Sequence, residues 1–115
     1  MIHSCEMAYD EGLAERLREL LAEIPRVKEK KMFGGLAFMV RGHMTVCVVN
    51  DDLMARVGPA EYPAALKKKH VREMDFTGRP LKGYVYVDPP GFESDKDLAK
   101  WVALALKFNE SMDPK

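Results

Sequence analysis

The sequence contains no apolar run near the roughly 20 residues that a helix needs to cross a bilayer, so we expect no transmembrane segment. Its first six residues, MIHSCE, have neither the positive charge nor the apolar core of a signal peptide. The two cysteines, Cys5 and Cys47, lie far apart, which argues against a disulfide framework. These absences together indicate a cytoplasmic protein with reduced thiols.

An excess of either charge is also absent, because 18 Lys and Arg residues balance 18 Asp and Glu residues. A dedicated duplex-DNA binder usually carries a basic excess, since phosphate neutralisation supplies much of its affinity. Solvated helix ends are the simpler interpretation of the local basic runs, and nucleic acid remains an alternative partner that we do not favour. The runs are Lys28, Lys30 and Lys31, and then Lys67, Lys68 and Lys69 with His70 and Arg72.

Catalytic and metal-binding patterns are missing as well. The three histidines form no zinc motif: Cys47 lies four residues from His43 only across an expected strand, and a zinc site needs three or four converging ligands. Cys47 lies in an expected strand with no base beside it, so it is not indicated as a nucleophile. Gly34 and Gly35 precede a strand, whereas a phosphate-binding loop carries Lys and Ser/Thr before a helix. We predict no catalytic residue, no metal and no cofactor, and therefore a protein that is not an enzyme.

The composition, with 47% hydrophobic and 31% charged residues, is typical of a globular chain. We expect one domain over residues 1–115, in which residues 1–9 form a mobile arm. The first helix is expected over 10–24, with Asp10 as N-cap and Pro25 as the stop signal. Its predicted buried stripe is Leu13, Leu17, Leu20, Leu21 and Ile24.

Short apolar runs with turn signals between them predict the remaining elements. A charged segment, 26–31, leads to Gly34 and Gly35, which indicate a tight turn or a bulge. The expected strands are 36–40, 44–49, 53–57, 71–76 and 81–87, and the expected helices are 61–69 and a long one that Ser94 opens. The order α-β-β-β-α-β-β-α, with hairpin-linked strands, predicts an α+β fold around an antiparallel sheet of about five strands.

Strand periodicity divides this sheet into two faces. One face is uniformly apolar and should lie under the helices: Leu36, Phe38, Val40, Val46, Val48, Leu53, Ala55, Val57, Val85 and Val87. The other is less polar than a solvated face should be: Ala37, Met39, Thr45, Cys47, Val49, Met54, Arg56, Tyr84 and Tyr86. Such a patch usually marks a binding surface, so we predict a homodimer that covers it. A helix or the N-terminal arm of the same chain is the alternative.

The segment MDFTGRPLKGY, residues 74–84, places Asp75, Arg79 and Lys82 in a hairpin with apolar flanks. An Asp–Arg pair that fixes the hairpin is the structural interpretation, and an edge that binds an anion or a peptide is the functional one. The candidate binding residues are Arg56, Asp75, Arg79, Lys82, Tyr84 and Tyr86.

Several segments in order, KMFGG (31–35), RVGP (56–59), MDFTGRP (74–80), GYVYV (83–87) and Leu98 to Val102, resemble the TfoX N-terminal domain family. The resemblance runs from about Leu13 to Met112. Its structural motif positions here are Met32, Phe33, Gly34, Gly35, Gly58, Pro59 and Gly78.

This resemblance implies an α+β fold similar to secretion-chaperone-like domains, of order α-β3-α-β2-α. Full-length members of the family are regulators of bacterial natural competence that carry a second, C-terminal domain, for which a chain ending at Lys115 has no room. The family offers no established catalytic residues. The resemblance therefore implies a stand-alone regulatory domain that acts by contact with a protein partner of unknown identity.

Overall fold

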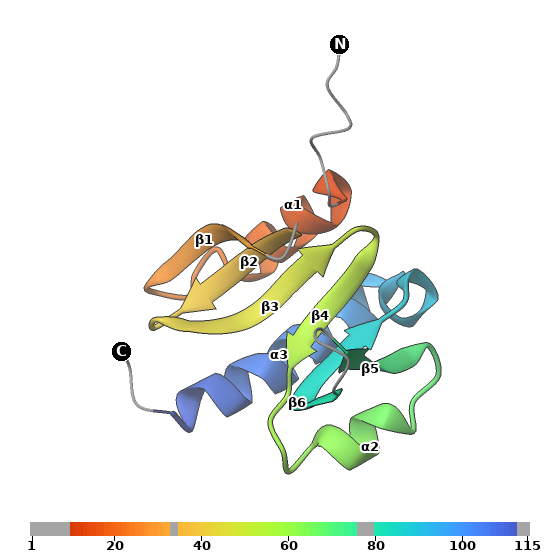
Figure 1. Ribbon diagram of the computed structural model, residues 1–115. Coiled ribbons are helices and arrows are strands. Elements are labelled where there is room, and N and C mark those ends of the chain that lie inside the picture. The colour runs from red at the N-terminus through yellow and green to blue at the C-terminus, as the bar shows by residue number, and fades with distance from the viewer. Residues whose placement is uncertain (1–9, 33–34, 76–79, 113–115) are drawn as a thin grey trace.

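A computed structural model of the protein describes residues 10–32, 35–75 and 80–112. Over these residues the chain forms one six-stranded antiparallel sheet, three α-helices and a short 3-10 helix, η2 (Figure 1). The strands are β1 (Val27–Met32), β2 (Gly35–Val40), β3 (His43–Val49), β4 (Asp52–Arg56), β5 (Val71–Asp75) and β6 (Pro80–Val87). The helices are α1 (Glu11–Leu20), α2 (Tyr62–Leu66), η2 (Pro89–Phe92) and α3 (Asp95–Glu110). The predicted arm, residues 1–9, lies outside the described residues.

The predicted α+β class and the antiparallel sheet are confirmed, with one strand more than expected. The strand order is β1-β2-β3-β4-β6-β5, so β1 and β5 form the two edges. The interpretation of residues 26–31 as a charged segment outside the sheet was wrong, because β1 pairs with β2 from Val27↔Val40 to Met32↔Gly35. Charged side chains are characteristic of edge strands, where they discourage pairing with other chains. The other strands lie within one residue of their predicted bounds.

The first helix is shorter than predicted. It ends at Leu20, and the amide groups of Ala22 and Ile24 then bond to carbonyls only three residues back. This tighter winding carries the chain to Pro25 while Ile24 still packs against the core. Leu20, predicted as buried, is 38% exposed because it falls beside the stripe that Leu13 and Leu17 define.

The other two helices differ from their predictions mainly in length. α2 stops at Leu66 rather than at residue 69, and the chain continues through turns. Ser94 caps α3 as predicted, because its hydroxyl accepts a hydrogen bond from the amide of Asp97 at 3.1 Å. In the described ranges no helix combines the length and the apolar character that crossing a membrane requires.

All three α-helices pack on one face of the sheet, and in Figure 1 α3 passes behind the strands. Nine of the ten predicted strand residues of this face belong to the main core, and Val40 is buried too. The helices contribute Leu13, Ala14, Leu17, Tyr62, Ala65, Leu98, Trp101, Val102 and Ala105. The helical layer leaves the opposite face of the sheet without a helix over the described residues.

Thr45 lies on the helical side of the sheet, so the prediction that it belongs to the opposite face was wrong. The register shifts from Phe38↔Val46 to Met39↔Met44, so Thr45 is an extra residue of β3 and its side chain turns toward α3. There Asn109, which is 2% exposed, donates from Nδ2 to the Val40 carbonyl at 2.9 Å and to Thr45 Oγ1 at 3.3 Å. One buried amide therefore joins α3 to both strands of this hairpin.

Two glycines allow close approaches that side chains would block. A Cβ on Gly35 would lie 2.1 Å from the Val48 carbonyl oxygen, so no larger residue fits there; the predicted turn or bulge at the glycine pair includes Gly34, which lies outside the described residues. Gly58 has φ +88° and would meet the Phe108 ring at 2.3 Å. The amides of Val57 and Gly58 both donate to the Gly83 carbonyl, so the chain leaves the sheet at the end of β4 while it is still bonded to β6.

Replacing Asn109 by alanine should lower the free energy of unfolding by about 2 kcal/mol, because the Val40 carbonyl and the Thr45 hydroxyl would both lose a buried partner. Denaturant titration measures the change. The neighbouring exposed Glu110→Ala is the control and should shift stability by less than about 0.5 kcal/mol. Equal effects in the two variants would refute the bridging role of Asn109.

Candidate functional site

The sheet face opposite the helices, here named the helix-free face, is the most distinctive surface of the domain. Its residues are Lys28, Lys30, Ala37, Met39, Met44, Cys47, Val49, Asp52, Met54, Arg56, Arg72, Tyr84 and Tyr86. One row of register partners crosses all six strands: Lys30, Ala37, Cys47, Met54, Tyr86 and Arg72. The row is apolar in the middle and has a basic residue at each edge, Lys30 on β1 and Arg72 on β5.

The adjacent row of partners, on the helical side, carries the opposite charge at its ends. It runs Glu29, Phe38, Val46, Ala55, Val85 and Glu73. Arg18 of α1 binds Glu29 with Nε–Oε2 and Nη2–Oε1 distances of 2.7 and 2.9 Å, and this hydrogen bonding lowers the pKa of Glu29. Tyr62 of α2 donates its hydroxyl to Glu73 at 3.4 Å. Glu29 and Glu73 of the edge strands thus face the helices, as Lys31 does, whereas Lys28, Lys30 and Arg72 face the helix-free side.

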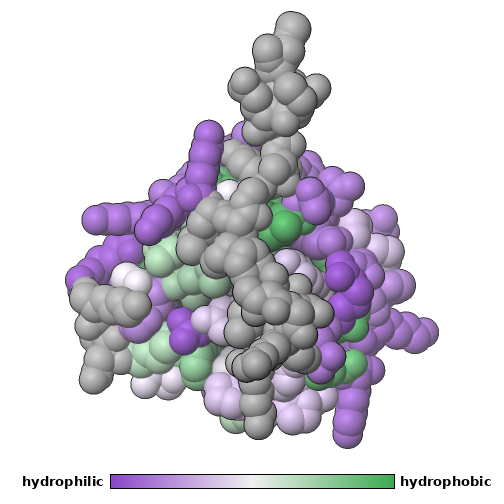
Figure 2. All heavy atoms as spheres, viewed as in Figure 1, coloured by the Kyte–Doolittle hydropathy of each residue, from purple (hydrophilic) through white to green (hydrophobic). Residues whose placement is uncertain are grey.

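The middle of the helix-free face is a small second core. Ala37, Cys47 and Met54 are fully buried there, and half-buried side chains surround them: Met39, Met44, Val49, Tyr84 and Tyr86. In Figure 2, viewed from the same side as Figure 1, hydrophobic residues lie inside an outline that is mostly hydrophilic. The face therefore keeps partly exposed apolar surface inside a polar rim.

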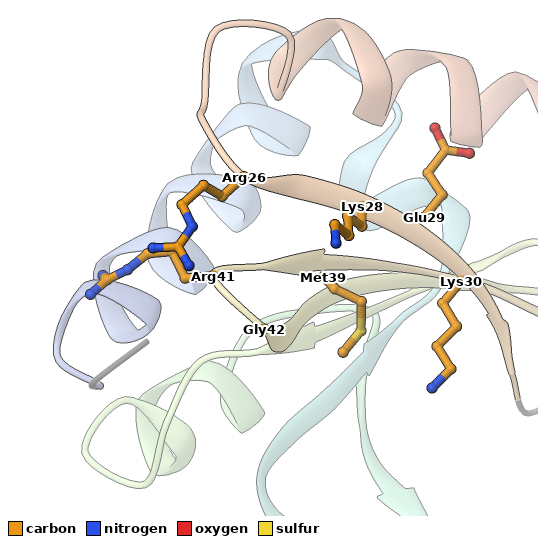
Figure 3. A pocket seen from close by; sticks show the side chains of 7 residues that line it. All are labelled: Arg26, Lys28, Glu29, Lys30, Met39, Arg41 and Gly42. Atoms are coloured by element: carbon orange, nitrogen blue, oxygen red, sulfur yellow. The ribbon is translucent and has the colours of Figure 1, made fainter. Parts of the chain in front are cut away.

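A basic pocket of about 370 Å³ lies at the β1–β2 end of this face. It is lined by Arg26, Lys28, Glu29, Lys30, Met39, Arg41 and Gly42 (Figure 3). In the close-up, Lys30 and Met39 extend on one side of the strands, whereas the Glu29 carboxylate extends the other way, toward α1. Four cations thus line a pocket whose single acid is already bound to Arg18.

Two arginines at one end of this pocket have a left-handed backbone conformation, which arginine rarely adopts. Arg26 has φ 63° and Arg41 has φ 55°, and the Arg41 amide bonds to the Arg26 carbonyl at 3.2 Å. The left-handed conformation costs a residue with a side chain about 1–2 kcal/mol. The Arg41 guanidinium also donates to the carbonyls of Asn109 and Met112, at 3.5 and 3.3 Å, near the negative end of the α3 dipole. The fold therefore holds Arg41 in place.

Arginines and tyrosines pair at the opposite end of the face. Arg56 lies over the rings of Tyr84 and Phe108, at 5.2 and 5.4 Å from their centroids. Arg72 lies over Tyr86 at 5.1 Å, and burial raises the pKa of that tyrosine. These guanidinium contacts are the cation–π type.

The two arginines differ in their acidic partners. Arg72 also bonds to Asp52 and Asp88, both at 2.8 Å, and its hydrogen bond lowers the pKa of Asp88. Among the described residues Arg56 has no acidic partner. Arg56 therefore keeps an uncompensated charge on the face, whereas Arg72 is neutralised.

Of the predicted binding residues, the structure brings together Arg56, Tyr84 and Tyr86 on β4 and β6. Arg79 lies outside the described residues, and so do Phe33, Gly34 and Gly78 of the predicted motif. For Asp75 and Lys82 the structure describes the strand backbone, not the side chains. The Asp–Arg pair in the hairpin therefore stays a prediction.

The residues of the basic pocket were not predicted as a site. Lys28 and Lys30 appeared only as part of a charge run, because 26–31 was not recognised as a strand. The alternation Lys28, Glu29, Lys30 was the available signal, since period-two charge reversal separates the two signs onto two faces. Arg26, Met39 and Arg41 gave no signal of their own, because only the hairpin geometry brings them beside the lysines.

Comparison with known families agrees with this arrangement. The family model described as the TfoX N-terminal domain matches residues 19–109. The chain belongs to the TfoX N-terminal domain family. The match spans β1 to β6 and nearly all of α3, so it includes every described residue of the helix-free face. Comparison with curated proteins gives no match.

The family motifs that the structure describes have structural roles in this TfoX N-terminal domain. The segment 56–59 supplies Arg56 to the helix-free face and Gly58 to the close contact with Phe108. The segment 83–87 places Tyr84 and Tyr86 on the helix-free face and Val85 and Val87 in the main core. Two further motif positions lie where the chain leaves a strand. Met32 is the last residue of β1, and Pro59 follows Gly58, after the end of β4. The motifs thus mark the sheet that presents this face.

Cys47 should be chemically inert in the folded protein. It is fully buried, and burial raises the pKa of its thiol to about 12, so about one thiol in 10⁴ is ionised at pH 8. In a Cys5→Ser chain we expect a maleimide to label Cys47 at least about 100-fold more slowly in buffer than in denaturant. A chain that also carries Glu110→Cys, at an exposed position, is the control, and in buffer it should take up one maleimide, at residue 110. Rapid native labelling of Cys47 would show that this face opens.

Proposed function

We propose that this TfoX N-terminal domain is a non-enzymatic regulatory module that binds an acidic, partly apolar segment of another protein through its helix-free face. The match to the family supports a domain like those of competence regulators, and the face supplies the binding surface. The observation that carries the proposal is the β1 edge of this face, where Lys28 and Lys30 border the apolar centre and have no acidic partner among the described residues.

The apolar part of the face has the composition of an interface centre. Methionine, tyrosine and arginine are enriched in interface cores relative to the remaining protein surface. Met39, Met44, Tyr84 and Tyr86 are half-buried in the single chain, so a partner would remove their remaining surface from water. That burial is the favourable, non-directional part of the binding energy.

The charge of the face determines the kind of partner. Lys28, Lys30 and Arg56 have no acidic partner among the described residues, and the only acid that lines the pocket is bound to Arg18. A partner with Asp or Glu beside large apolar side chains would satisfy these cations while it covers Met39. Two copies packed face to face would bring these cations together, which costs energy unless their register separates them. Charge therefore favours a different, acidic protein over the predicted second copy.

Nucleic acid is less well suited to this face. Sheets that bind single strands offer aromatic rings on which bases stack. Here a guanidinium already lies over each tyrosine, Arg56 over Tyr84 and Arg72 over Tyr86. A protein segment needs no such open ring, because its carboxylates contact the cations directly.

Selection from a displayed library of random peptides tests the proposal. We expect the enriched peptides to combine acidic and large apolar residues, and Lys28→Glu with Lys30→Glu to weaken a selected peptide by about tenfold or more, because both changes place like charges at the contact. Lys100→Glu with Lys107→Glu, the same charge change on α3, is the matched control and should leave affinity nearly unchanged.

Two outcomes would contradict the proposal. Enriched peptides without acidic residues, or equal losses in the two charge-reversed chains, would remove the helix-free face as an acidic-segment site. Light scattering on the free chain tests the other occupant: a mass of twice 13.0 kDa that Met39→Ser returns to 13.0 kDa would identify a second copy as the partner.

A further inference from the structure

A second basic surface lies on the helical side of the domain, away from the helix-free face. Two adjoining hollows there, of about 370 and 230 Å³, share Lys68, Lys100 and Leu104 and form one groove between α3 and the turns after α2. We name it the lysine groove. Its charged lining residues are Lys68, Lys69, Lys100, Lys107 and Asp97, with His70 beside them.

The charges of the lysine groove are unbalanced. Four lysines face one acid, Asp97, and no ion pair joins these lysines to an acid within the residues that the structure describes. Lys100 and Lys107 lie seven residues apart on α3, which spaces them about 10.5 Å along its axis. The fold brings Lys68 and Lys69, some 30 residues earlier in the sequence, to the same groove. The groove is thus an extended row of positive charge.

We propose that the lysine groove binds the sugar–phosphate backbone of a nucleic acid without reading its sequence. Lysine ammonium groups contact phosphates as point charges and confer little geometric selectivity. Trp101, the only Phe, Tyr or Trp among the described lining residues, is only 5% exposed and donates its indole N–H to the Gly91 carbonyl at 3.3 Å, so no base stacks on it. The groove therefore contacts backbone phosphates, not bases.

An anionic membrane is the other extended surface that four lysines would attract. Stable attachment to a membrane surface also needs apolar side chains that enter the lipid. The one large hydrophobic residue that is exposed in the described part of the chain is Leu20, and it belongs to α1 rather than to the groove. A phosphate backbone requires no such anchor, so the groove fits a nucleic acid better.

This inference is independent of the proposed acidic-segment site. Lys28 and Lys30 lie on the helix-free face, whereas the groove lies between α2 and α3 in the helical layer. The structure therefore separates the two lysine runs of the sequence onto different surfaces. Loss of one site should leave the other intact.

Salt-dependent binding to a DNA duplex of arbitrary sequence tests the groove. If four lysines contact phosphates, log K should fall with log salt at a slope of about −3.6, which is about a 150-fold loss of affinity between 50 and 200 mM salt. Lys100→Gln with Lys107→Gln should reduce that loss to about 12-fold, because two contacts remain. Both positions are exposed, so the variant should fold normally, and its thermal melting confirms this.

Lys28→Gln with Lys30→Gln removes the same charge from the opposite face and should leave the slope and the affinity unchanged. A scrambled duplex should show the same loss of affinity in salt, and the corresponding single strand a loss of about 50-fold, because its slope per contact is smaller. Equal effects of the two double variants would overturn the groove, and so would salt-insensitive binding. Tighter binding to vesicles that contain phosphatidylserine than to the duplex would replace the nucleic acid by a membrane surface.

Discussion

The register of the antiparallel sheet is the constraint on which both surfaces of this domain depend. Because side chains alternate, the pairing that places Phe38, Val46, Ala55 and Val85 under the helices also places Ala37, Cys47, Met54 and Tyr86 on the helix-free face. The same alternation orients the edge strands, with Glu29 and Glu73 toward the helices and Lys30 and Arg72 away from them. A slip of one residue would exchange the two sets and bury the charges of both edges.

The sequence allowed most of the fold to be predicted, because it follows from local patterns. The central strands, the capped α3 and the apolar set under the helices all have strong periodicity. The errors share one physical cause, which is that tertiary context outweighed local pattern. β1 is a strand because β2 offers it six register partners, although VKEKKM lacks an apolar alternation. Thr45 changed sides because the hairpin accommodates an extra residue that Asn109 then binds. The basic pocket was missed for the same reason, since it combines the unrecognised strand with Arg41 of a turn.

The chain has no net charge and yet carries two basic surfaces, and the positions of its acidic residues explain how both can be true. Glu15 and Glu29 bind Arg18 on the helical layer, while Asp52 and Asp88 are bound to Arg72. These pairs are largely surface pairs, which contribute little to stability. Their main effect is spatial, because they neutralise Arg18 and Arg72 and leave Lys28, Lys30 and the lysines near α3 uncompensated among the described residues. Net charge alone therefore could not indicate whether a local basic surface exists.

The arginines of the basic pocket do not contribute to stability in an obvious way. Glycine or asparagine would adopt the left-handed backbone at Arg26 and Arg41 with less strain, and the turn needs no guanidinium. Arg41 recovers part of this cost at the carbonyl end of α3, but Arg26 has no such contact in the described residues. Gathering four cations around one pocket adds repulsion that the folded chain alone does not offset. A partner that supplies carboxylates would offset this repulsion upon binding, although not the backbone strain, and this supports the proposal of an acidic segment.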